Sequence, residues 1–235
     1  MVYRKFLCIL IFFSILSHLY AQGRDAGSHP YVIRGEVHVE LEPIYAGQID
    51  REYPLDIPTA GRRGLQEIAL FFSGMIYGWS FFYEIGERAR QIEEVLELEA
   101  LGTIPDGDPA LRVTDTSIRG SQLVIWADYH LSSVQQSRMQ IWRSGNVRSA
   151  QGIGFGPTYL GEYTSWLAIR KLALEDAARA AIRAILQNSE RNRPKEASGF
   201  ISLASFPRFF IQGGRWVVSA RFRVQVNEIV PFAVH

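Results

Sequence analysis

Histidines and carboxylates give this sequence its clearest potential for metal binding or acid–base chemistry. His38 is flanked by Glu36 and Glu40, and His130 lies two residues after Asp128. If the two segments met in the fold, two imidazole nitrogens would stand beside carboxylate oxygens, a set that zinc accepts. However, no third histidine ligand and no HExxH-type spacing accompanies them,. We therefore expect two histidines on half-exposed strand faces.

Two loop-like motifs resemble ligand sites only in part. Asp106-Gly107-Asp108 looks like a fragment of a calcium loop, but the acidic ligands that should follow are missing, and a turn between prolines explains it,. The glycines of 152–156 suggest a phosphate loop, yet Pro157 stands where that fingerprint needs glycine and no Lys-Ser/Thr pair follows,. We expect a turn and a flexible connection, with no cofactor-binding residue and no metal ligand. Catalytic motifs such as Gly-x-Ser-x-Gly are also absent from the sequence,.

The N-terminus predicts export from the cytoplasm. Arg4 and Lys5 precede an apolar run over residues 6–16, and the small residue Ala21 supplies an exit that signal peptidase accepts,. The alternative is a retained anchor, but the run is shorter than the roughly 20 apolar residues that span a bilayer. We expect residues 1–21 to be a cleaved signal peptide and 22–31 to be disordered. The mature chain is then periplasmic or secreted, and it is not a lipoprotein because no cysteine follows the exit.

Composition excludes several classes of protein. The only cysteine is Cys8, inside the predicted signal, so the mature chain would have no disulfide, thiolate nucleophile or cysteine zinc site,. The formal net charge of +1 gives no support to nucleic-acid binding,. No second apolar run reaches membrane-spanning length, so no integral membrane segment remains after cleavage,.

Apolar periodicity predicts an α+β fold in which antiparallel sheets are each covered by one helix. Residues 59–73 have helical spacing and end at Gly74, where a helix cap belongs,. Residues 75–85 are rich in aromatic residues and indicate a strand buried on both faces,. We expect a second helix at 165–188, a loop at 102–122, a glycine-rich link at 152–161, a tight turn at 212–214, and strands at 32–41, 91–99, 122–131, 138–142, 200–211 and 215–229.

An internal repeat is the main organisational prediction. Residues 59–99 and 165–226 both have the order helix, glycine, aromatic strand, turn and amphipathic strand,. A shift of 125 residues places Gly74 on Gly199, Ile76 on Ile201, Ser80 on Ser205, Phe81 on Phe206 and Arg90 on Arg215. We therefore expect two related helix-strand-strand units, 32–118 and 119–235.

Charge on the final strands of these two units suggests how they pack. Glu93 and Glu97 make one strand face acidic, whereas Arg221 and Arg223 make the other basic. Opposite charges across paired strands each contribute a few tenths to about 1 kcal/mol. We hypothesise that the acidic and basic faces pair between the units; two solvated strand faces are the simpler alternative.

The second unit resembles a known family. The alanine-rich helix from Leu172 to Ile185 is followed by Gly199 and by a strand over Val217 to Val226. This is similar to the N-terminal domain of the flagellar assembly protein FlgT and the related envelope lipoprotein family. The family's glycine-alanine strand before the helix is replaced here by residues 159–164, and the lipid-attachment cysteine is missing. The resemblance implies a non-enzymatic structural role in the cell envelope, beside the flagellar motor.

These observations predict a non-catalytic exported envelope protein that acts in macromolecular assembly, with a protein partner or a second copy. The aromatic segments supply the candidate contacts, which are Tyr77, Trp79, Tyr83, Phe206 and Phe210. The alternative is a protein that binds a small ligand or a cell-wall glycan in a cleft between the units, and a third is an envelope hydrolase. A flat apolar patch favours assembly, whereas a concave pocket with converging polar groups favours ligand binding.

Overall fold

The computed structural model describes residues 31–44, 53–86, 93–156, 165–189 and 194–231. The predicted signal peptide and residues 22–30 lie outside these ranges. Contact density groups Val32–His235 into one compact unit. All statements below concern the described part of that unit.

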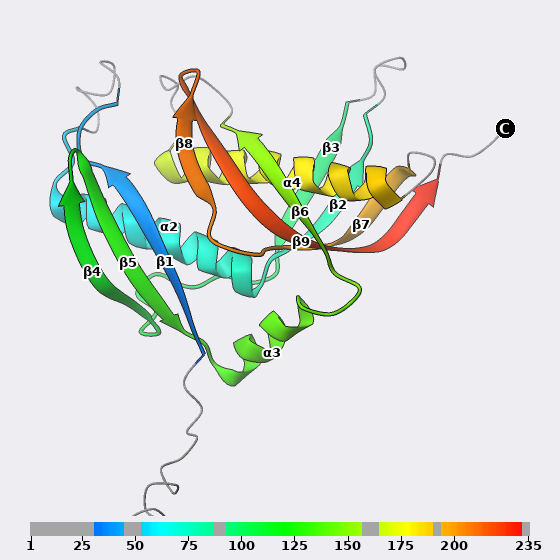
Figure 1. Cartoon of the computed structure of the whole chain (residues 1–235), viewed down its shortest axis with the longest axis horizontal. Helices are drawn as coiled ribbons and strands as arrows, with labels where there is room; N and C mark the ends of the chain where they lie inside the picture. The colour runs from blue at the N-terminus through cyan, green and yellow to red at the C-terminus, as the bar shows by residue number, and fades with distance from the viewer. Residues whose placement is uncertain (1–30, 45–52, 87–92, 157–164, 190–193, 232–235) are drawn as a thin grey trace, which may run out of the picture. The chain divides into compact units, whose positions relative to one another are not determined.

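The first half of this unit is a β-α-β-β arrangement that we call the N-terminal module. It consists of β1 (Val32–Glu40), α2 (Ile57–Ile76), β4 (Leu111–Arg119) and β5 (Gln122–His130). The three strands form an antiparallel sheet in the order β1-β5-β4, and α2 packs on β1 and β5 (Figure 1).

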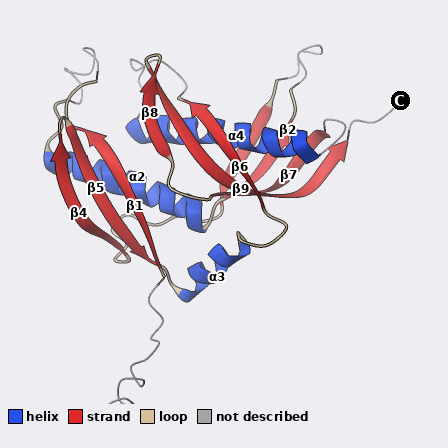
Figure 2. Cartoon of the chain, in the orientation of Figure 1, coloured by secondary structure: helices blue, strands red, loops and turns tan. Residues whose placement is uncertain are grey.

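The second half follows the same path and is called the C-terminal module. It consists of β6 (Arg148–Phe155), α4 (Trp166–Ser189), β7 (Pro194–Leu203) and β9 (Arg215–Pro231). The strands are antiparallel in the order β6-β9-β7, with α4 packed on β6 and β9 (Figure 2). In both modules the strand that comes last in the chain lies between the other two. The predicted α+β class, with one helix over each antiparallel sheet, is confirmed.

Additional elements connect the modules. β2 (Trp79–Glu84) and β3 (Val95–Ala100) follow α2 in the chain, yet they extend the C-terminal sheet because β2 pairs with β7. β8 (Arg208–Gln212) pairs with β9, and α3 (Ser133–Ile141) joins the modules and contacts α2. The boundary expected at 118/119 is corrected, since it falls between β4 and β5, which are neighbours in one sheet.

The two modules share a topology, but their residues do not align as predicted. A shift of 125 residues places Gly74 and Ile76 of α2 on Gly199 and Ile201 of β7, so helix falls on strand. Phe81 is buried in the middle of β2, whereas Phe206 lies in the connection between β7 and β8. The aligned repeat is therefore wrong, although each module keeps the order of one helix and two following strands.

Helix α2 begins and ends differently from the prediction. Asp56 caps its N-terminus by accepting a hydrogen bond from the Thr59 amide at 2.6 Å,. The helix continues through Gly74, which is not its cap: a Cβ there would lie 2.4 Å from the Trp79 ring, so glycine allows close packing. Gly78, at φ 69°, provides the left-handed residue after the helix,. As a result β2 starts at Trp79, and Phe82 on its other face is 36% exposed, so β2 is not buried on both faces.

The glycines of 152–156 are structural and do not form a flexible link. They belong to β6, which lies directly against α4. A Cβ at Gly152 would lie 1.9 Å from the Ala177 carbonyl oxygen, and one at Gly154 would lie 2.1 Å from that of Ala173. Glycine on the strand and alanine on the helix therefore bring the two backbones together.

Two other predicted segments were wrong. Residues 138–142 were expected as a strand but fall in α3 and its end, where a capping box between Ser132 and Gln135 starts the helix,. Residues 102–122 were expected as loop but include β4, whose side chains are mostly exposed and so lack the apolar alternation of a half-buried strand,. The Asp106–Asp108 turn is confirmed, with Gly107 at φ 76°.

The hypothesis of paired acidic and basic strand faces is also contradicted. β3, which carries Glu97, and β9, which carries Arg221 and Arg223, are separated in the sheet by β2 and β7. Arg221 and Arg223 lie opposite Gln151 and Ser149 of β6, and Glu97 lies opposite Phe82. Glu93 lies two residues before β3 and is likewise distant from β9 in the strand order.

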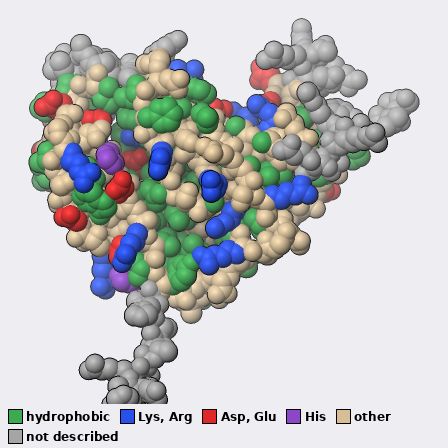
Figure 3. Space-filling view, in the orientation of Figure 1, with side chains coloured by type: hydrophobic (Ala, Val, Ile, Leu, Met, Phe, Trp, Pro, Cys, Tyr) green, Lys and Arg blue, Asp and Glu red, His purple; other side chains and the backbone are tan. Residues whose placement is uncertain are grey.

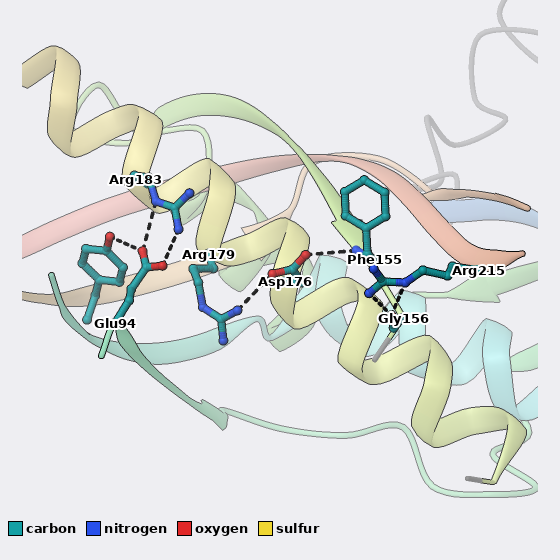
Figure 4. A network of polar contacts seen from close by, with 8 residues as sticks. Glu94, Phe155, Gly156, Asp176, Arg179, Arg183 and Arg215 are labelled. Carbon is teal, nitrogen blue, oxygen red and sulfur yellow. Dashed lines mark hydrogen bonds and ion pairs between the residues drawn. The ribbon is translucent and has the colours of Figure 1, made fainter. Parts of the chain in front are cut away.

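A different carboxylate from the same segment makes the ion pair. Glu94 binds Arg183 of α4 and accepts a hydrogen bond from the Tyr83 hydroxyl (Figure 4). Further along α4, Asp176 accepts hydrogen bonds from the Phe155 amide at 3.0 Å and from Arg179 at 2.9 Å. The contacts with Glu94, just before β3, and with Phe155 of β6 attach α4 to the two edges of its sheet.

Candidate functional site: a cleft between β1 and β8

A cleft of about 900 Å³ lies between the N-terminal module and the C-terminal module. One wall is the edge of β1 from Arg34 to His38, and the opposite wall is the segment from Ser205 to Ile211, which includes β8. The floor is formed by Glu67 and Phe71 of α2 and by Arg170 of α4, together with Trp216. The cleft is thus built by residues from both halves of the chain.

A buried ion pair occupies the floor. Glu67 and Arg170 are only 2% and 3% exposed, and Arg170 Nε lies 3.3 Å from Glu67 Oε1. Burial raises the pKa of Glu67 to about 7, against the opposing influence of Arg170 and of His38,. Burial also lowers the pKa of Arg170, against the influence of Glu67. Desolvation of both groups makes the pair costly unless further contacts compensate.

Aromatic rings supply part of that compensation. The guanidinium carbon of Arg170 lies 3.7 Å from the ring centre of Trp216, 4.4 Å from that of Phe209 and 5.5 Å from that of Trp166. Cation–π attraction is strongest where water is excluded, and reaches about 2 kcal/mol there. The rings therefore hold the guanidinium in place on the floor of the cleft.

Hydrogen bonding of this pair is nevertheless incomplete. Glu67 Oε2 and Arg170 Nε and Nη1 are buried and have no hydrogen-bond partner within the described part of the chain. An unsatisfied buried polar group costs about 1–3 kcal/mol. The floor thus offers an acceptor and donors side by side, so a molecule bearing both a donor and an acceptor would complement it.

The rim is polar and carries both signs of charge. On β1, Arg34 lies 3.2 Å from Asp128, and His38 lies 3.7 Å from Glu36. Glu40 accepts a hydrogen bond from Gln122 at 2.5 Å. Arg208 stands on the opposite wall. The apolar lining consists of Val37, Phe71, Phe206, Pro207, Phe209, Phe210, Ile211 and Trp216.

Only two of the five predicted interaction residues line the cleft. Phe210, which is 41% exposed, forms part of the β8 wall. Phe206 packs edge-on against Phe71 and Phe72 of α2, with ring centres 5.2 and 5.3 Å apart. It also covers Gly35 of β1, where a Cβ would lie 2.3 Å from the ring. Phe206 therefore joins the modules beneath the cleft.

Tyr77, Trp79 and Tyr83 lie elsewhere. The Tyr77 hydroxyl accepts a hydrogen bond from Gln135 of α3 at 2.8 Å, and the Trp79 ring packs on Gly74. Tyr83 is buried, and burial together with its hydrogen bond to Glu94 raises its pKa to about 12. These three aromatics act in packing between elements.

The two histidines do not meet. His38 lies opposite Val124 and His130 lies opposite Val32, at the two ends of the β1–β5 pairing. No cluster of three or more His, Cys, Asp or Glu side chains suited to a metal occurs in the described ranges. In the Asp106–Asp108 turn, Asp108 accepts hydrogen bonds from the Ala110 amide and the Tyr129 hydroxyl.

Sequence reasoning missed Glu67 and Arg170. A signal was present, because each charged residue falls on the apolar stripe of its helix. Glu67 is followed by buried Ile68 and Phe71, and Arg170 is followed at three and seven residues by buried Ala173 and Ala177. A charge on a core-facing stripe indicates a buried partner or a site.

Comparison with known proteins gives one relative and a family match. An uncharacterised protein of Treponema pallidum (strain Nichols) is 26% identical over 175 residues, which cover 73% of this chain and 70% of that protein. No solved structure matches the chain. No helix in the described residues is long and apolar enough to cross a membrane. A protein-family model matches residues 21–232, nearly the whole chain, and the chain belongs to that family.

Proposed function

We propose that this chain is an exported, non-catalytic binding protein of the cell envelope that takes its ligand in the cleft between β1 and β8. One observation carries the proposal: a buried carboxylate–guanidinium pair on the floor has unfilled hydrogen-bonding groups beside aromatic walls. Ligand sites of this size commonly combine apolar walls with a few converging polar groups. Of the three roles weighed from the sequence, the concave site favours ligand binding over assembly.

Export rests on the predicted signal over residues 1–21,. The envelope assignment rests on the resemblance to the FlgT domain family. A feature of β6 supports that resemblance, because the strand before α4 does carry Gly152 and Gly154 against helix alanines. Residues 159–164, considered a departure from the family's strand, lie outside the described residues.

A second candidate function, assembly through a protein surface, is favoured by a flat apolar row. Phe155 of β6 and Phe210 of β8 both lie opposite Val217 of β9, and Ile153 lies on the same face of the sheet,. Ile153 is 52% exposed, and the two phenylalanines are each 41% exposed. Figure 3 shows apolar side chains gathered over β8 and the start of β9, with basic side chains nearby. Sedimentation of the full chain and of an Ile153→Ser/Phe155→Ser variant tests whether this face joins two copies.

The ligand-binding proposal is tested by affinity selection on the immobilised full chain. One probe set is a phage library of short linear peptides, and the other is a set of soluble cell-wall muropeptides. Ser205→Trp places a bulky ring in the cleft wall, whereas Ser137→Trp places the same ring on the exposed side of α3 and serves as the control. We expect a ligand from one set whose binding is abolished only by Ser205→Trp. The proposal fails if neither set yields a ligand or if both variants bind it equally.

A further inference from the structure

We infer that the occupant of the cleft is an extended peptide segment of a partner protein, which adds as a strand to the free edge of β1. This inference rests on the proposed binding function and specifies its ligand. Strand addition uses main-chain hydrogen bonds for affinity and alternate side chains for specificity. The geometry of β1, the composition of the cleft walls and the chemistry of the floor each support it.

The edge of β1 that faces the cleft has no strand partner within the described ranges. β1 pairs in register with β5, from Val32 opposite His130 to Glu40 opposite Gln122, and with no other described strand. Its other edge therefore presents backbone N–H and C=O groups in a row. Such a row is a ready template for another strand.

The alternation of backbone hydrogen bonds along β1 identifies which residues direct their N–H and C=O groups to the open edge. The Leu41 amide donates to the Ser121 carbonyl at 2.8 Å, and the register from there back along β1 is unbroken. Backbone groups alternate between the two edges of a strand, so odd-numbered residues face β5. The backbones of Arg34, Glu36 and His38 consequently face the open edge. The His130 amide donates to Ala110 of the β4 side at 3.0 Å, as the same parity requires.

Consecutive residues line both walls of the cleft. Every residue from Arg34 to His38 and every residue from Ser205 to Ile211 contributes to the lining. Because side chains alternate between the two faces of a strand, a cavity beside one face would be lined by every second residue. An unbroken run means that the strand edge itself forms the wall. The cleft is therefore shaped to run along a backbone.

The floor specifies one side chain of the incoming peptide. Glu67 Oε2 needs a donor and Arg170 Nη1 needs an acceptor, and both are unpartnered in the described residues. A primary amide, as in Asn or Gln, offers an N–H and a carbonyl oxygen on one planar group. We therefore expect the bound segment to place an amide side chain over the floor, with apolar side chains against Phe206 and Phe210.

The first test uses a peptide selected on the full chain and an edge proline. His38→Pro removes the N–H that faces the cleft, and proline is tolerated on strand edges. Ile118→Pro is the matched control, since it makes the same change on β4 of the same sheet, away from the cleft. His38→Ala removes the side chain but keeps the N–H. We expect His38→Pro to weaken binding at least about tenfold beyond His38→Ala, as loss of a main-chain hydrogen bond implies.

The second measurement scans the selected peptide with N-methyl groups. In a paired strand every second N–H is bonded to its neighbour, so N-methylation should abolish binding at alternate positions and leave the positions between them nearly unchanged. Equal losses for His38→Pro and His38→Ala, or no alternation in the scan, would overturn strand addition. If only muropeptides bind at the cleft, the peptide inference fails while the proposed binding function stands.

Discussion

The two modules follow the same β-α-β-β path but finish their sheets differently. In the C-terminal module, β2 and β3 continue the sheet beyond β7, and β8 adds to β9. In the N-terminal module, the three-stranded sheet ends at β1 and at β4, and no other described strand pairs with these edges. The C-terminal sheet is thus widened by added strands, whereas the N-terminal sheet stays three-stranded and ends at the cleft with β1. We propose that recognition uses the β1 edge of the N-terminal sheet.

The two modules also differ in which element carries the glycine at the contact between helix and sheet. In the C-terminal module the glycines are on the strand, and their missing Cβ atoms would meet the backbone of α4. In the N-terminal module the glycine is on the helix: a Cβ at Gly64 would lie 2.4 Å from the end of the Ile125 side chain. A side-chain end can move, whereas a helix backbone cannot move without shifting the helix. The C-terminal module is therefore the less adaptable of the two.

Removing the Glu67–Arg170 ion pair between the modules should lower the free energy of unfolding more than any other change considered. Arg170→Ala removes the partner of Glu67 and leaves a buried carboxylate alone, which typically costs about 3–5 kcal/mol. Lys171→Ala, at the next and exposed position of α4, should change stability by less than about 0.5 kcal/mol,. Urea denaturation of both variants measures the difference. Equal stabilities would mean that the pair contributes nothing to joining the modules.

The next largest loss of stability is expected from alanine substitutions at Gly152 and Gly64. We expect Gly152→Ala to destabilise the chain by about 3 kcal/mol or more, because its Cβ would overlap the Ala177 carbonyl oxygen,. Gly64→Ala should cost about 1 kcal/mol or less, since Ile125 can shift and alanine favours the helix by a similar amount,. Thermal unfolding of the two variants ranks them. The reverse order would contradict the assignment of the C-terminal module as the less adaptable one.

The stability of the folded chain should depend on pH because of Glu67. Its pKa is about 7 in the folded chain and 4.5 for the ordinary group, so the folded state holds the proton more tightly. Stability from this group is complete below pH 4.5 and is lost as the pH rises toward 7. The full loss relative to Glu67→Gln is about 3 to 4 kcal/mol and is reached above pH 7, because the pKa rises from 4.5 to about 7 and each pH unit corresponds to about 1.4 kcal/mol,. Unfolding curves for both proteins across this range test it, and parallel pH profiles would reject it.

The smallest change in stability is expected for two glutamates, Glu94 of the observed ion pair and Glu97 of the predicted strand-face pairing. Glu94→Gln loses its charge interaction with Arg183, which is partly exposed, and should cost about 1 kcal/mol,. Glu97→Gln, on the edge strand β3 that follows Glu94, should cost less than about 0.5 kcal/mol,. Denaturant midpoints of the two variants decide between them. A larger loss for Glu97→Gln would contradict the assignment of Glu94 as the ion-pairing carboxylate.

The sequence predicted the elements whose periodicity is strong and missed those set by tertiary contacts. The two long helices and the β1, β5 and β9 segments follow from apolar spacing, because one face of each is buried. β4 was missed because its exposed side chains carry no alternation. Gly152 and Gly154 were interpreted as flexible because only the fold shows that α4 lies against them. A cleft between the two halves was the alternative prediction, and its floor depends on Glu67 and Arg170, which meet only when α2 and α4 pack.

Residue-resolved amide exchange of the free chain tests most directly whether β1 has an open edge toward the cleft. The Gly35, Val37 and Val39 amides face β5 and should be protected, whereas the Glu36 and His38 amides should exchange orders of magnitude faster,. This alternation needs no ligand and no variant. Uniform protection from Ile33 to Val39 would show that another segment already pairs with this edge, and the account of an open recognition strand would be wrong.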